Sequence, residues 1–362
     1  FIRRFDFIYD DVLIQVNESD LLQTELLSHK FYYKKGLFIG SEGTDEWGFK
    51  NLNNSFCTNL TNVTPYYVTN GVLQKMSLPT GGSVIYEFES NTYSFNETKP
   101  IDQTHTQNGW EVNPAFYTQL NYKNLHNFQV QNLVASSFTT NSSVSFTVTT
   151  PKEYVFKLTG ELYQSPLVDS EGNYGMFYPT FTLLKNGVIV NNQLSVQSLC
   201  DNEGLGLKKS LGIGNYTLTM NASAPTSGTA TVIDYTPKSN VNKWHYGNGI
   251  RIKRIGFFDT DIVSQKYYEH LNPTIFPAKE ISYDYSMIDN PSTSSGCIYT
   301  FDVLESTPTV IYRNVTVTQL GGVGKTVYTL YSPLDYYAIA DYDGQKPNFS
   351  KPKNIKVYNE SG

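Results

Sequence analysis

Cysteine, methionine and charged residues are all scarce in this chain of 362 residues. The three cysteines, Cys57, Cys200 and Cys297, lie far apart, so no Cys-x-x-Cys spacing for zinc or redox chemistry exists. Their odd number leaves at least one thiol unpaired within the chain. Three cysteines are compatible with a single disulfide, but they exclude the multiply bridged framework of a small secreted domain.

Long apolar runs and blocks of positive charge are also missing. The apolar stretch from Phe5 to Val16 is interrupted by three aspartates, and no run approaches the roughly 18 residues of a membrane-spanning helix. The formal net charge is −6, whereas binding to a nucleic-acid backbone rests on many cationic contacts. We therefore expect no transmembrane segment in this chain and no nucleic-acid partner.

Aromatic residues, in contrast, are abundant, with 28 Tyr and 21 Phe. Such side chains suit the pleated, half-buried surface of a sheet. The segment 78–93 shows the pattern, because strands alternate on either side of the turn Pro79-Thr80-Gly81-Gly82. The two faces of the second strand are Val84, Tyr86 and Phe88 on one side and Ile85, Glu87 and Glu89 on the other. The sequence predicts a half-buried antiparallel hairpin here.

The residue pattern of the chain changes twice along its length. Residues 1–133 and 238–362 are rich in Tyr-containing hairpins, whereas residues 134–237 carry short alternating strands at steady spacing, typical of a small β-sandwich. The pair Asn186-Gly187 is the strongest hairpin signal, because both residues tolerate the positive φ of a type I′ turn. We expect a mainly β fold, with an antiparallel body built from both ends of the chain and an inserted sandwich.

One short helix is also expected in the first part of the chain. Asn17 or Ser19 can cap its N-terminus. The residues expected in it are Leu21, Leu22, Glu25, Leu26 and Leu27.

Three blocks carry a resemblance to a known family. They are LPTGGSVIYEFESNTY (78–93), GNGIRIKRIGFFDTDIVSQKYYEH (247–270) and VIYRNVTVTQLGGVGKTVYTLYSP (310–333). They resemble blocks of the Rhs/YD-repeat-like secreted or surface proteins common in Bacteroidota, with departures such as Phe88 in place of Tyr. Within the sandwich, Leu211 to Met220 is similar to the strand that ends bacterial pre-peptidase C-terminal and related jelly-roll modules.

The resemblance implies an exported protein with an Rhs-like antiparallel body and a jelly-roll-like insert. In related proteins such strands build a shell that can enclose a C-terminal cargo domain, and no catalytic residue is implied in this segment. The chain starts at Phe1 without an initiator Met, which we interpret as a piece of a longer precursor. Its expected partners are therefore other proteins or the remainder of its own longer chain.

Several motifs are better explained by turns and packing than by chemistry. The run from Gly321 to Thr326 resembles a phosphate-binding loop, but it has Gln319 where that loop needs Gly, and β-type residues follow where a helix must begin. No cofactor is expected. Calcium is the alternative at the carboxylate turns 169–173 and 341–344, although neither has the ligand count of a calcium loop. The five histidines lack metal-binding spacing, and ordinary packing explains them better.

Flat aromatic side chains rimmed by amides suggest a second class of function. Sugar rings stack on such faces, and the residues of a glycan-contact site would be Trp47, Trp110, Trp244 and Tyr246. We therefore keep three hypotheses. The first is a non-catalytic structural or interaction segment of a larger secreted or cell-surface bacterial protein, an Rhs-like shell or adhesin. The others are a carbohydrate-binding module and a hydrolase whose site is assembled across the fold.

Overall fold

The computed structural model of the chain has a mainly β fold, which confirms the predicted fold class. Its strands are accompanied by three short 3₁₀ helices, η1 (Pro114–Thr118), η2 (Tyr122–Asn127) and η3 (Pro333–Asp335), and the described ranges contain no α-helix. The structure describes residues 4–20, 25–34, 43–44, 50–51, 63, 65, 68–101, 103–106, 109–112, 114–168, 174–195, 206–262, 275–299, 309–320, 324–335 and 349–359.

The chain divides into two compact units. The first comprises Phe1–Leu52, Val63–Asn113 and Lys243–Gly362, and the second comprises Asn53–Asn62 and Pro114–Asn242. Both ends of the chain thus belong to the first unit. We call the first unit the sheet body and the second the sandwich unit.

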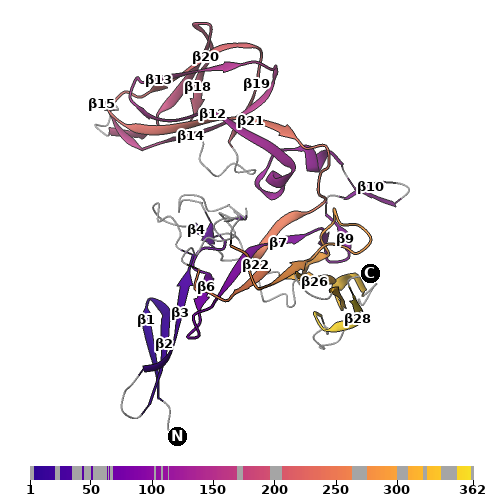
Figure 1. Ribbon diagram of the computed structural model, residues 1–362. Coiled ribbons are helices and arrows are strands. Elements are labelled where there is room, and N and C mark those ends of the chain that lie inside the picture. Colours follow the sequence, from indigo (N-terminus) through magenta and orange to yellow (C-terminus); the bar gives the residue numbers. More distant parts are fainter. Residues whose placement is uncertain are drawn as a thin grey trace. The chain divides into compact units, whose positions relative to one another are not determined.

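The sheet body is organised around one ten-stranded sheet whose strands follow each other in chain order (Figure 1). Every neighbouring pair in it is antiparallel. The strands, from one edge to the other, are β1 (Arg4–Asp10), β2 (Val12–Ser19), β3 (Glu25–Tyr33), β6 (Leu73–Ser77), β7 (Ser83–Tyr93), β22 (His245–Phe258), β23 (Lys279–Asp284), β26 (Asn314–Leu320), β27 (Gly324–Leu330) and β28 (Pro352–Tyr358).

Smaller sheets complete this unit. A four-stranded sheet has the order β25 (Thr309–Tyr312), β24 (Gly296–Tyr299), β8 (Phe95–Asn96) and β9 (Lys99–Pro100), and its β24 and β8 are parallel. Two-stranded ladders are formed by β4 (Gly43–Thr44) with β5 (Lys50–Asn51) and by β10 (Gln103–Thr106) with β11 (Gly109–Val112).

The N-terminal half of the sheet tests two sequence predictions. The hairpin around 79–82 is confirmed, since β6 and β7 pair and Gly81 has a φ of 91°, a backbone conformation that favours glycine. The expected helix is wrong where it overlaps the described residues: Glu25 starts β3, and Leu27 pairs with Glu18 of β2. Pairing with strands on both sides outweighs the helix propensity of these residues.

The sandwich unit consists of two four-stranded antiparallel sheets and one additional hairpin. The first sheet has the order β12 (Phe128–Thr139), β21 (Ser227–Pro237), β14 (Lys152–Gly160) and β19 (Leu207–Leu211). The second has the order β13 (Ser143–Val148), β20 (Gly214–Asn221), β17 (Thr180–Lys185) and β18 (Val188–Ser195). The hairpin joins β15 (Tyr163–Val168) to β16 (Tyr174–Phe177).

Alternating apolar residues of both sheets meet in a single core. Phe156 of the first sheet and Phe181 of the second are both fully buried, and the rings of Phe138 and Phe181 lie 5.4 Å apart in a T-shaped arrangement. Edge-to-face contacts of this kind add to the stabilisation from burial. The predicted Asn186-Gly187 turn is confirmed, with φ values of 50° and 81° between β17 and β18.

Candidate functional site

Of the four predicted glycan-contact residues, the structure describes the side chains of Trp244 and Tyr246. Trp47 lies outside the described residues, and Trp110 lies on β11 with a side chain that the structure does not describe. Trp244, which directly precedes β22, and Tyr246 on β22 have ring centroids 5.2 Å apart in a T-shaped arrangement. Both rings are half-buried. Glycan contact therefore stays a prediction, now centred on this pair.

The hydroxyl of Tyr246 is held in its neutral form. Burial raises the pKa of this tyrosine to about 12, and the nearby carboxylate of Glu89 acts in the same direction while Arg251 opposes it. A neutral phenol can donate and accept one hydrogen bond at an aromatic face. This is the chemistry that the carbohydrate hypothesis requires, although it is equally suited to packing.

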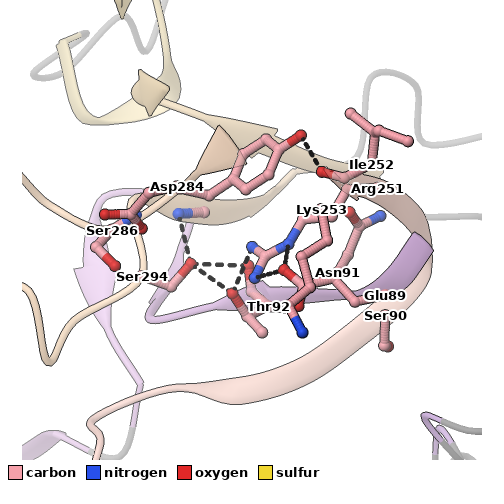
Figure 2. A network of polar contacts seen from close by, with 12 residues as sticks. Glu89, Ser90, Asn91, Thr92, Arg251, Ile252, Lys253, Asp284, Ser286 and Ser294 are labelled. Atoms are coloured by element: carbon pink, nitrogen blue, oxygen red, sulfur yellow. Dashed lines mark hydrogen bonds and ion pairs between the residues drawn. The ribbon is translucent and has the colours of Figure 1, made fainter. Parts of the chain in front are cut away.

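The most elaborate polar cluster surrounds Arg251 on β22 (Figure 2). Its Nε and Nη2 contact Oε1 of Glu89 on β7 at 2.7 Å. Its Nη1 donates to Oγ1 of Thr92 at 2.8 Å and to the hydroxyl of Tyr312 at 3.0 Å. Each guanidinium nitrogen therefore already has a protein partner.

Two tyrosine rings enclose the same guanidinium group. Its central carbon lies 4.5 Å from the ring centre of Tyr285 and 5.3 Å from that of Tyr312, within the range of cation–π attraction. Burial by itself would lower the pKa of Arg251, but Tyr312 and Glu89 outweigh it and raise that pKa. Burial also raises the pKa of Tyr285 and of Tyr312. The arginine is therefore charged and both phenols are neutral.

A chain of hydroxyl groups extends the cluster to neighbouring strands. Thr92 Oγ1 donates to Ser294 Oγ, and Ser294 Oγ donates to the Thr92 carbonyl, both at 2.9 Å (Figure 2). Ser295 Oγ is 2.8 Å from the carbonyl oxygen of Tyr285 and 2.9 Å from that of Asn314, and it accepts from the Asn314 backbone N–H. These short side chains join β7 to the segments that flank β24 and β26.

This arrangement is suited to holding strands together. Its donors and acceptors bond to one another, so the cluster offers no nucleophile with an activating base. No sequence motif marks Arg251, Tyr285 or Tyr312 as members of one cluster. A usable signal was present, however, because Glu87 and Glu89 on one strand face Arg254 and Arg251 on the other in register.

A second ion-pair group lies beside the first on the same two strands. Glu87 accepts from Lys253 at 3.0 Å and also pairs with Arg254. Lys253 is the extra residue where the register shifts between Ile252 and Arg254, which lets two cations reach one carboxylate. Opposite charges on adjacent strands favour this pairing of β7 with β22 over others.

The remaining motifs give no further site within the described ranges. Gly324 opens strand β27, so a strand follows the Gly-rich run where a nucleotide loop needs a helix. Both carboxylate turns proposed for calcium lie outside the described residues. Among the residues that are described, no three His, Cys, Asp or Glu side chains converge as metal ligands would.

The cysteines and histidines are described only in part. Cys57, Cys200 and His270 lie outside the described residues. Cys297 is a free, buried thiol on β24, and burial raises its pKa to about 12. A thiol with so high a pKa is a poor nucleophile at neutral pH. His245 is buried, with its ring centre 5.8 Å from that of Tyr93 in an edge-on contact.

The outer strands of the ten-stranded sheet are β1 and β28. No described strand pairs with the outer edge of β1 or of β28. Apolar side chains are nevertheless exposed on both: Phe7 is 57% exposed on β1, and Val357 is 77% exposed on β28. An edge strand presents unpaired backbone N–H and C=O groups to which another strand can bond. These two edges are the best candidate for a functional surface.

Comparison with known proteins adds no identity to this geometry. No protein-family model, curated protein or solved structure matches the chain. In the part of the chain that the structure describes, no helix has the length and apolar character needed to cross a membrane.

Proposed function

We propose that this chain is a non-catalytic structural or interaction segment of a larger secreted or cell-surface bacterial protein, and that it acts by strand pairing. The observation that carries this proposal is a ten-stranded sheet whose strands follow chain order and whose outer edges, on β1 and β28, pair with no strand that the structure describes. Such a sheet can be extended by further hairpins on either side without a change in topology. An Rhs-like shell is one form of such an extended sheet.

The character of the edge strands supports this role. Soluble proteins usually protect an edge strand with charge, proline or a covering loop, since an exposed apolar edge promotes association. Both edge strands carry charged residues, but β1 also exposes aromatic side chains, with Phe5 53% and Tyr9 66% exposed. A surface of this kind is explained by a partner that covers it in the native assembly.

The test is the extent of the native polypeptide. We would purify it from its source, measure its mass and map its tryptic peptides beyond Gly362. Further Tyr-rich hairpins that lead to an unrelated C-terminal domain would support the proposal. A native chain that ends near this residue would contradict an extended shell.

Carbohydrate binding is the second candidate function, and the Trp244–Tyr246 pair favours it. Two adjoining, half-buried aromatic rings offer a face on which a sugar ring can stack. A glycan array tests it: the unaltered chain should bind a defined glycan, and Trp244→Ala should abolish that binding. Equal signals from both proteins would overturn this candidate.

A further inference from the structure

The two open edges of the sheet carry opposite charge. Residues 4–11, which include β1, contain Arg4 and three aspartates, whereas residues 351–358, which include β28, contain three lysines and no acid. Charges of like sign on an edge strand discourage it from pairing with another copy of itself. The charges of these two edges therefore disfavour pairing of β1 with β1 and of β28 with β28, and they favour pairing of β1 with β28.

Strand direction agrees with that combination. Ten strands joined by antiparallel pairings alternate in direction, so the first and the last run opposite ways. A second copy placed beyond the edge of the first would therefore bring its β28 antiparallel to β1. The alternation would continue from one copy into the next.

The apolar faces of the two edge strands also coincide. Paired residues share one face of an antiparallel sheet. Residues two apart on one strand also share a face, so the face of Phe7 can be followed from strand to strand through the paired residues. In order, these are Phe7 and Val16, His29 and Phe31, Met76, Val84, Phe257, Lys279 and Ile281, Gln319 and Val317, Thr326, and finally Val357. Phe7 and Val357 thus lie on the same face at opposite edges, and a shifted copy presents matching faces.

We propose that this chain associates head to tail with a second copy of itself, through antiparallel pairing of β28 with β1. One register of the two strands places opposite charges together on one face of the sheet and apolar side chains together on the other. It places Asp6 opposite Lys356, Phe5 opposite Val357, Phe7 opposite Ile355 and Tyr9 opposite Lys353. Side chains directly opposite each other lie about 5 Å apart, close enough for an ion pair and for apolar contact.

This inference rests on the proposed role in strand pairing and names the partner. The contact joins two different edges, so it does not close on itself, and each added copy leaves a new β1 and a new β28 free. Association should therefore increase steadily with protein concentration instead of stopping at a dimer. Lys356 is exposed, and Asp6 is half-buried and pairs on its own strand with Arg4 at 2.9 Å. We expect the folded chain to tolerate a change of charge at either position, because exposed ion pairs contribute little to stability.

The experiment is sedimentation of the full chain across a concentration series, with Asp6→Lys and Lys356→Asp variants whose folding is checked by circular dichroism. Unaltered protein should associate, and each single variant should associate about tenfold more weakly because like charges then face each other. An equimolar mixture of the two variants should recover association, since every contact in an alternating chain again joins opposite charges. Monomeric unaltered protein, or a mixture no better than its components, would overturn the inference.

Zero-length cross-linking tests the register. A carbodiimide joins a carboxylate to an amine in contact, so an Asp6–Lys356 link should appear between differently isotope-labelled copies. Association without this link would overturn the proposed pairing. A chain that stays monomeric while the native polypeptide continues into further hairpins would contradict self-association alone, and the broader role in strand pairing would remain.

Discussion

The sandwich unit and the sheet body are stabilised in different ways. In the sandwich unit, sixteen buried apolar residues from both sheets form one core. The described apolar cluster of the sheet body is small, with Ile85, Phe258 and Ile262 as its buried members. Its strands are joined instead by the ladder itself and by the Arg251 cluster. The sandwich unit thus depends on a large apolar core between two sheets, whereas the sheet body depends mainly on strand pairing and polar contacts.

This difference bears on where a partner can act. The sandwich buries the inner faces of its two sheets against each other, and its edge strand β18 also exposes apolar side chains, with Val188 69% and Ile189 59% exposed. In the sheet body, no described strand covers the outer edge of β1 or of β28, so apolar side chains and backbone groups of both strands are available for pairing. The tryptophans allow the two units to be followed separately, since Trp47, Trp110 and Trp244 all fall within the sheet body and none within the sandwich unit.

The largest expected effect is in the sandwich core. Phe156→Ala removes a fully buried ring and leaves a cavity, which should lower the free energy of unfolding by about 3–5 kcal/mol. Urea unfolding followed by circular dichroism should show an earlier transition, while tryptophan fluorescence should keep its midpoint. Val188→Ala, at a 69% exposed position of the same unit, is the matched control. A shift of both signals together would show that the units unfold as one.

The next largest effect is expected in the sheet body, where a substitution should shift the tryptophan fluorescence transition. Arg251→Met leaves the carboxylate of Glu89, which is 31% exposed, without its cation and breaks the contacts to Thr92 and Tyr312. We expect a loss of about 3 kcal/mol, visible in the tryptophan transition. Lys253→Met on the same strand removes a more exposed cation and should cost about 0.5 kcal/mol. Equal losses would show that the buried cluster has no special weight.

Acid should weaken the sandwich unit through His126. Burial and the nearby Lys238 lower the pKa of this histidine to about 3, below its ordinary value of 6.5. Between these values the unfolded chain binds the extra proton, so stability falls as the pH falls. The expected loss is about 2 kcal/mol from about pH 7 to pH 5. His126→Gln should reduce this dependence in unfolding curves, and an unchanged slope would exclude the histidine as its source.

The smallest effect on stability is expected at the edges. Val357→Thr and Phe7→Thr alter exposed side chains at opposite edges, and each should change the unfolding free energy by less than about 0.5 kcal/mol. The same variants should nevertheless weaken association of the chain. A large loss of stability would mean that these side chains support the folded monomer and are not an interaction surface.

Local patterns made much of this fold predictable. Alternation and turn residues located the hairpin at 79–82 and the turn at Asn186-Gly187, because both depend on neighbours in sequence. The strand at Glu25 could not be found in this way, since its structure depends on pairing with β2 and β6. The same holds for the Arg251 cluster, because Glu89, Tyr285 and Tyr312 meet it only after distant strands have paired.

Hydrogen–deuterium exchange at the two edge strands tests the central claim most directly. In dilute isolated chain, the outward-facing amides of β1 and β28 should exchange rapidly, whereas those of β14 and β21 in the sandwich should be protected. In the native full-length polypeptide or its assembly, the same edge amides should become protected. Rapid exchange at both edges in the native form would contradict the account, because it would show that no strand pairs there.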